Sequence, residues 1–195
     1  LFYKDPSKSD AKAKKIAVMI PGYKEDAVIL NVAKKAMEQD YPQGKYDVVV
    51  IADSFMESTL SELEMLNLKL IRVRFEKSTK SKALNKAMEI LPDDYDLAVI
   101  LDADNIMEND FLRKVNNAFS DEVQVLQGHR AAKNTDTNFA VLDAISEEIN
   151  NHIFRKGHIA TGLSAALIGS SMAFRYRLFK DYMNKIKAIG GFDKG

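Results

Sequence analysis

The sequence lacks cysteine. This absence excludes disulfide bonds, zinc–thiolate sites and thiol nucleophiles. Long apolar runs are absent too: no stretch approaches the roughly 18 apolar residues of a membrane span. There is also no excess of charge, because 28 basic residues balance 28 acidic ones, so we expect no nucleic-acid partner. With 195 residues, the chain is long enough for one domain with a substantial core.

Residues 1–15 are polar and rich in lysine, which is typical of a linker or tail. A basic stretch lying beside an anionic membrane surface is the alternative. The chain starts at Leu1 and stops at Gly195 on a glycine-rich turn, so we expect further sequence on both sides in a parent protein.

Apolar runs and helical periodicities alternate along the first part of the chain. They predict strands at 16–20, 46–52, 69–74 and 97–101, and helices at 25–39, 58–66, 78–91 and 110–119. Ser58, Ser61 or Glu62 offers a cap for the second helix, and Asp110 caps the fourth. Such alternation is typical of an α/β fold with an open, mostly parallel sheet flanked by helices.

The pattern changes in the second part. We expect short strands at 123–126 and 172–174, a long amphipathic helix at 138–154 and a further helix at 176–183. The stretch 157–171 is rich in glycine and small residues, which excludes a plain helix there.

A pair of carboxylates, Asp102 and Asp104, follows the strand predicted at 97–101. If the chain stays extended, residues two apart point to the same side, and both carboxylates face one place. Two adjacent carboxylates repel each other, so a site that keeps both ionised usually holds a cation beside them. Ligands that are all oxygen atoms suit Mg²⁺ or Mn²⁺. The alternative is a solvated turn. Tyr23 and Asp53 follow two other predicted strands, and ligands bind beyond the carboxyl ends of the strands in such sheets.

Five segments together resemble the family-2 glycosyltransferases with the GT-A fold. They are the opening strand with Pro21-Gly22-Tyr23-Lys24-Glu25, the second strand with Asp53-Ser54, Lys80-Ser81-Lys82-Ala83-Leu84-Asn85, Asp102-Ala103-Asp104, and Gly169-Ser170-Ser171-Met172-Ala173-Phe174. The chain departs from the family's pattern at four of them. Lys24 replaces the usual asparagine, and the usual pair of aspartates is reduced to Asp53. Ser81 replaces the glycine of K-G-x-A-L-N, and Ser171 the second glycine of G-[ST]-G-M-A-F.

The resemblance implies a domain over 16–195, with a nucleotide-binding half at 16–120 and an acceptor-side half at 121–195 that is incomplete at its C-terminus. It implies a nucleotide pocket, an inverting sugar transfer from a donor that is usually UDP-linked, and Mg²⁺ or Mn²⁺ as cofactor. The residues to which it assigns nucleotide binding are Pro21, Tyr23, Glu25, Asp53 (to the base), Lys80 (to the diphosphate) and Asp102 (to ribose or a metal-bound water), with Asp104 and Asp102 at the metal.

An inverting transferase needs a general base for the acceptor hydroxyl. The family's base follows the turn at Gly191-Phe192-Asp193, so we expect it beyond Gly195, with Asp193 as the nearest candidate in this chain. The resemblance further implies a glycan or lipid-linked acceptor and a membrane-attached parent with this domain on the cytoplasmic face.

Two other functions fit part of the pattern. A D-x-D phosphatase also places two aspartates after a buried strand, although Asn105-Ile106 follows here. A receiver-like signalling domain would use Asp53 as phospho-acceptor with Lys80 or Lys82 beside it, and would leave the region after residue 123 unexplained.

Overall fold

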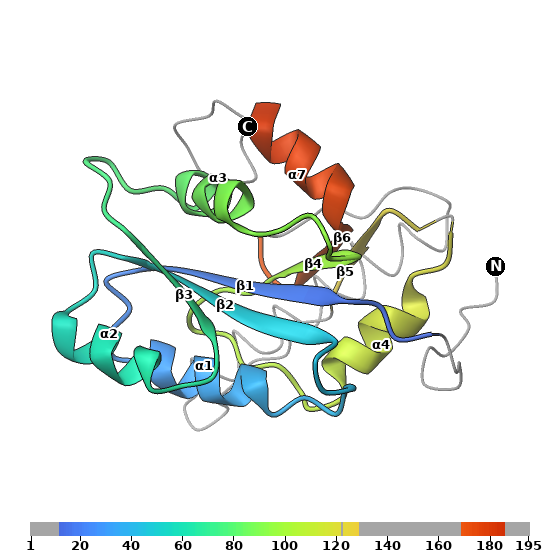
Figure 1. Cartoon of the computed structure of the whole chain (residues 1–195), viewed down its shortest axis with the longest axis horizontal. Helices are drawn as coiled ribbons and strands as arrows, with labels where there is room; N and C mark the ends of the chain where they lie inside the picture. The colour runs from blue at the N-terminus through green and yellow to red at the C-terminus, as the bar shows by residue number, and fades with distance from the viewer. Residues whose placement is uncertain (1–11, 122, 129–168, 186–195) are drawn as a thin grey trace, which may run out of the picture.

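A computed structural model describes residues 12–121, 123–128 and 169–185 (Figure 1). Its centre is a six-stranded sheet in the order β3-β2-β1-β4-β6-β5. The strands are β1 (Ile16–Tyr23), β2 (Tyr46–Asp53), β3 (Lys69–Val73), β4 (Leu97–Ile100), β5 (Val125–Gln127) and β6 (Met172–Arg175). The first four run parallel, and β6 pairs antiparallel with both β4 and β5. The predicted open, mostly parallel sheet is therefore confirmed.

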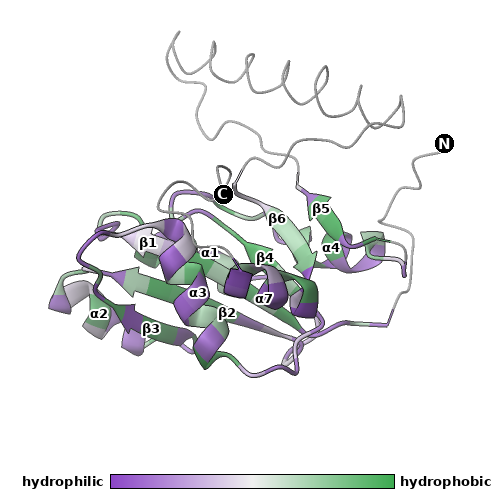
Figure 2. Ribbon diagram, turned by 90° about the horizontal axis from the view of Figure 1, so that it is seen from above, coloured by the Kyte–Doolittle hydropathy of each residue, from purple (hydrophilic) through white to green (hydrophobic). Residues whose placement is uncertain are grey.

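Helices cover both faces of the sheet (Figures 1 and 2). Side chains of α1 (Ile29–Met37), α2 (Glu57–Glu64) and α4 (Phe111–Ala118) share one apolar cluster, and those of α3 (Lys80–Ile90) and α7 (Tyr176–Lys185) share the other. Successive strand residues alternate between the clusters: Val18 belongs to the first, and Met19 to the second. Because β1, β2 and β4 are largely buried on both faces, their sequences are nearly continuous apolar runs, whereas the edge strand β3 carries Lys69 and Arg72.

Strand β1 is three residues longer than the predicted 16–20 and passes through Pro21. The Met19 carbonyl accepts a hydrogen bond from the Leu101 N–H at 3.0 Å, on the β4 side of the strand. Pro21 lies two residues further and faces the same side, where the β4 pairing has already ended at Ile100. The missing N–H therefore costs no ladder bond, and pairing with β2 continues to Tyr23.

Several helix boundaries differ from the prediction. Helix α1 begins at Ile29 rather than at Glu25, because the Glu25 carbonyl closes a turn with the N–H groups of Val28 and Ile29 at 3.2 and 3.1 Å. Helix α2 begins at Glu57 after Met56, without a side-chain cap, so the predicted serine cap is wrong. Asp110 is the N-cap residue of α4, but its side chain makes no capping hydrogen bond.

Some predictions lie outside the residues that the structure describes. These are the helix at 138–154, Asp193 and most of the tail at 1–15, while the division of the domain at residue 120 stays a prediction. Within the described ranges, no helix has the length and apolar character needed to cross a membrane.

Candidate functional site

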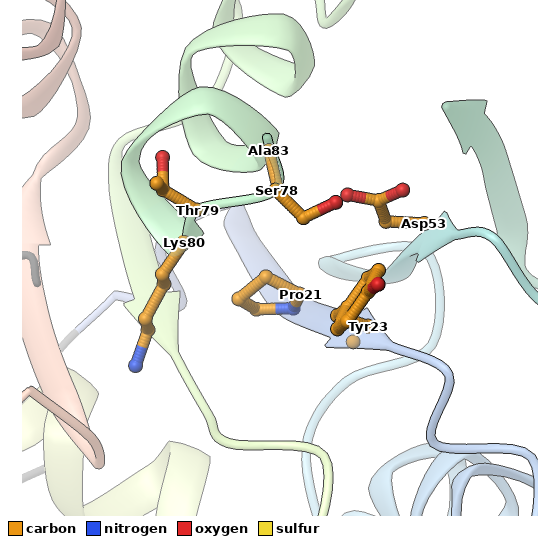
Figure 3. A pocket seen from close by; sticks show the side chains of 8 residues that line it. Pro21, Tyr23, Asp53, Ser78, Thr79, Lys80 and Ala83 are labelled. Atoms are coloured by element: carbon orange, nitrogen blue, oxygen red, sulfur yellow. The ribbon is translucent and has the colours of Figure 1, made fainter. Parts of the chain in front are cut away.

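A cavity of about 170 Å³ lies where β1 and β2 end beside the start of α3 (Figure 3). Its lining residues are Pro21, Gly22, Tyr23, Asp53, Ser78, Thr79, Lys80 and Ala83. Small-molecule sites commonly occupy roughly 300–1,000 Å³, so these residues form one part of such a site. The structure thus brings together four of the predicted nucleotide-binding residues: Pro21, Tyr23, Asp53 and Lys80.

Asp53 is the buried acid of this cavity, with 2% of its surface exposed. Its Oδ1 accepts a hydrogen bond from the Ser54 hydroxyl at 2.9 Å, and its backbone carbonyl accepts one from the Lys24 N–H at 3.1 Å. No other hydrogen bond to the carboxylate comes from the described part of the chain. In Figure 3 the carboxylate points across the cavity toward Ser78. A buried carboxylate with a spare oxygen selects a ligand that carries an N–H or O–H donor.

Tyr23 forms the open wall of the cavity, with 51% of its surface exposed. The Lys24 ammonium lies 5.2 Å from the centre of its ring. An exposed aromatic ring beside a buried acid offers a flat apolar surface on which a planar ligand can stack.

Helix α3 begins at the cavity with Lys80, and Thr79 is its N-cap. The Thr79 hydroxyl accepts a hydrogen bond from the Lys82 N–H at 3.2 Å. Lysine opposes the dipole at a helix N-terminus. Here the Lys80 ammonium is compensated by Asp102 Oδ1 at 2.5 Å and also donates to the Gly169 carbonyl. Amide groups and an ammonium at one helix end make this side of the cavity attractive to an anion.

The two aspartates of the D-x-D segment lie in a turn, not in an extended strand. Strand β4 ends at Ile100, and the Asn105 N–H donates to the Asp102 carbonyl at 3.1 Å. The expectation that both carboxylates share one side because the chain is extended is therefore wrong. Asp102 is half-buried, Ala103 is buried and Asp104 is exposed. The local reason is that Ala103 packs inward on the apolar cluster that contains Leu101.

The carboxylates of Asp102 and Asp104 provide some, but not all, of the ligands that a divalent ion needs. Within the described ranges there is no group of three acidic, histidine or cysteine residues around one point. Asp104 is exposed, and no hydrogen bond or ion pair from the described residues occupies its carboxylate, whereas Lys80 occupies one oxygen of Asp102. Mg²⁺ is commonly held by one or two carboxylates together with substrate phosphates, which is the number of acids available here.

Four predicted residues do not line the cavity, and others were missed. Asp102 and Asp104 lie on the turn after β4. Glu25 is exposed and does not line the cavity, and Asp193 lies outside the described residues. The prediction omitted Ser78, Thr79 and Ala83, although their place at the start of the helix after β3 could have indicated them. It also assigned no role to Ser170, whose hydroxyl accepts a hydrogen bond from the Asp102 N–H at 2.9 Å.

Solved structures of similar fold include a mannosyltransferase and a second protein, each in complex with a nucleotide sugar. Mannosyltransferase PcManGT from Pyrobaculum calidifontis, in complex with GDP-Man and Mn²⁺, superposes with a TM-score of 0.60 at 22% identity, over 92% of this chain and 51% of that one. TarS 1–349 from S. aureus, in complex with UDP-GlcNAc, gives a TM-score of 0.62 at 19% identity, over 86% and 47%. At these identities the likeness concerns the fold.

The sequence itself matches a curated relative and a family model. The β-monoglucosyldiacylglycerol synthase of Nostoc sp. is 29% identical over 168 residues, which are 82% of this chain and 35% of the relative. This chain thus spans about a third of the length of that curated relative. The model of the family described as glycosyltransferase like family 2 matches residues 13–195. This match decides against the phosphatase and receiver alternatives. Because it covers nearly the whole chain, the chain belongs to glycosyltransferase family 2, and its sheet and helices form the GT-A fold.

Proposed function

We propose that this chain is the donor-binding part of an inverting glycosyltransferase that moves a sugar from a UDP-linked donor to an acceptor hydroxyl. The observation that carries the proposal is the cavity in which Asp53, Tyr23 and Lys80 meet at the carboxyl ends of the strands. A nucleoside diphosphate has three matching parts: a base with an N–H donor, a planar ring and a negatively charged diphosphate.

Each side chain has a separate role in this proposal. The spare oxygen of Asp53 accepts the N–H of the base, and a base without that donor leaves the buried carboxylate unpaired. The Tyr23 ring packs on the base. Lys80 and the first N–H groups of α3 neutralise the diphosphate, whose charge grows as the sugar leaves.

A divalent ion adds to this stabilisation of the leaving diphosphate when it is bound. Asp104 would hold it directly, with Asp102 on the same turn as the second carboxylate. The Mn²⁺ bound in the PcManGT complex supports a divalent ion, and the choice between Mg²⁺ and Mn²⁺ is open to experiment.

The remaining parts of the proposal concern the parent protein. The acceptor is a glycan or a lipid-linked hydroxyl, and the name of the Nostoc relative favours a lipid. We propose a membrane-attached parent with this domain on the cytoplasmic face. The general base lies beyond Gly195, with Asp193 as the candidate inside the chain.

Calorimetric titration with UDP-sugars, with Mn²⁺ or Mg²⁺ and with EDTA, tests the metal's role. We expect metal to strengthen binding to the wild type and to have no effect on Asp104→Ala. Asp121→Ala is the matched control, because Asp121 is also exposed and makes no ion pair within the described residues. Equal affinity of the wild type with metal and with EDTA would contradict the assignment of Asp104.

A further inference from the structure

The Ser170 side chain makes hydrogen bonds to both ends of the turn that carries the D-x-D segment, Asp102–Asn105. It is fully buried, at 0% exposure, and its hydroxyl oxygen accepts two hydrogen bonds. The Asp102 N–H donates to it at 2.9 Å and the Asn105 side-chain amide at 2.7 Å. These are the first and last residues of the turn. A serine oxygen has two acceptor sites, so a single hydroxyl fastens both ends.

The chain on either side of Ser170 is anchored to other elements. The Ser170 carbonyl accepts a hydrogen bond from the Gln127 side-chain amide at 2.8 Å, and the Ser171 carbonyl accepts one from the Gly128 N–H at 2.7 Å. A Cβ added to Gly128 would lie 2.8 Å from the Ser171 oxygen, so only glycine allows this approach. The Gly169 carbonyl accepts a hydrogen bond from the Lys80 ammonium. The hydroxyl therefore belongs to a segment fixed by both α3 and the end of β5.

We propose that Ser170 is a positioning residue that sets the conformation of the Asp102–Asn105 turn and thereby the affinity of the site for a divalent ion bound together with the diphosphate. It would touch neither of them. The proposal rests on the proposed function, because it concerns the metal that Asp104 and Asp102 would hold. Groups that orient ligands through hydrogen bonds commonly change metal affinity about 10- to 100-fold when they are removed.

The test compares two neighbouring serines. Ser170→Ala removes the double acceptor. Ser171→Ala is the matched control, because Ser171 is also buried and its hydroxyl makes no hydrogen bond to the described residues. Mn²⁺ affinity is measured by electron paramagnetic resonance on the UDP complex of each variant, and UDP affinity by calorimetry in EDTA.

We expect Ser170→Ala to lower the Mn²⁺ affinity about tenfold or more while its UDP affinity in EDTA stays at the wild-type value. Ser170→Thr keeps the hydroxyl and should restore Mn²⁺ affinity. Asn105→Ala, at a half-buried position, removes one of the two bonds and should give a smaller loss in the same direction. Mn²⁺ affinity that is equal in Ser170→Ala and Ser171→Ala would overturn the proposal, and so would an equal loss of UDP affinity in EDTA.

A second measurement separates this proposal from the proposed function. If the wild type bound neither UDP nor Mn²⁺, the donor-binding function would fail, and amide hydrogen exchange at Asp102 would still test the turn. The Asp102 amide should exchange at least about tenfold faster in Ser170→Ala than in Ser171→Ala, because only the first loses its acceptor. Equal exchange rates in the two variants would overturn the role of Ser170.

Discussion

Three residues other than glycine adopt a positive φ within the described part of the chain: Lys24, Ser54 and Ser171, at 55°, 58° and 54°. Two of them, Lys24 and Ser171, are positions at which the chain departs from the family's motifs, where asparagine and glycine are usual. Asparagine, aspartate and glycine tolerate the left-handed region better than other residues. The departures at Lys24 and Ser171 therefore carry a backbone cost.

Ser171→Gly should stabilise the protein. The left-handed conformation costs a residue with a Cβ about 1–2 kcal/mol, and the extra freedom of an unfolded glycine offsets part of that gain. We expect a net increase of about 0.5–1 kcal/mol in the free energy of unfolding, measured with urea. Ser171→Ala, which keeps the Cβ, is the control. A glycine variant less stable than the alanine variant would contradict the strain at this position.

Among the elements, the buried strands were predictable and the geometry beyond their ends was not. Three apolar runs indicated β1, β2 and β4, because strands buried on both faces need apolar residues nearly throughout, and an imperfect alternation indicated the edge strand β3. The D-x-D turn depends instead on Ser170, which lies 68 residues away from Asp102 in sequence. No local pattern carries such a contact. The sequence predicted only part of the cavity lining for the same reason. Tyr23 and Asp53 lie at the ends of predicted strands, whereas Ser78 lines the cavity because α3 packs beside those strand ends.

The cap of α3 gives a test at this scale. Thr79→Ala removes the hydroxyl that accepts from the Lys82 N–H, and such a loss costs about 1 kcal/mol of stability. Because α3 begins at the cavity, UDP affinity should fall as well, whereas Thr79→Ser should preserve both. Urea unfolding and calorimetry measure the two effects. Unchanged stability in the alanine variant would show that this cap contributes little.

In the whole molecule, residues distant in sequence meet at the carboxyl ends of the strands. Aromatic rings are buried in other parts of the fold. Burial raises the pKa of Tyr41 to about 12 and that of Tyr176 to about 12. The Tyr41 hydroxyl also joins the segment before β1 to α4, at 2.8 Å from the Lys14 carbonyl and 3.1 Å from Asn116 Oδ1. Both phenols are thus held in the neutral form by the fold.

Stability should consequently fall at alkaline pH. A tyrosine in the unfolded chain ionises near pH 10. The pKa of both tyrosines is higher in the folded protein than in the unfolded chain. Their contribution to the free energy of unfolding is therefore fully present below about pH 10 and is lost as the pH rises toward 12. Urea unfolding at a series of pH values, with ultraviolet titration of the phenols, measures this. Tyr41→Phe should show a shallower decline, and an identical decline would contradict the role of Tyr41.

The central claim is that the cavity between β1, β2 and α3 binds the nucleoside end of a UDP-sugar through Asp53. Calorimetric titration of the wild type, Asp53→Ala and the exposed control Asp121→Ala with UDP and with N3-methyl-UDP tests it most directly. Asp53→Ala should weaken UDP binding by roughly 1–3 kcal/mol and lose the preference for UDP over N3-methyl-UDP, which lacks the N–H donor of the base, because a buried hydrogen bond to the base disappears. Asp121→Ala should bind like the wild type. Equal UDP affinity in all three proteins would contradict the claim.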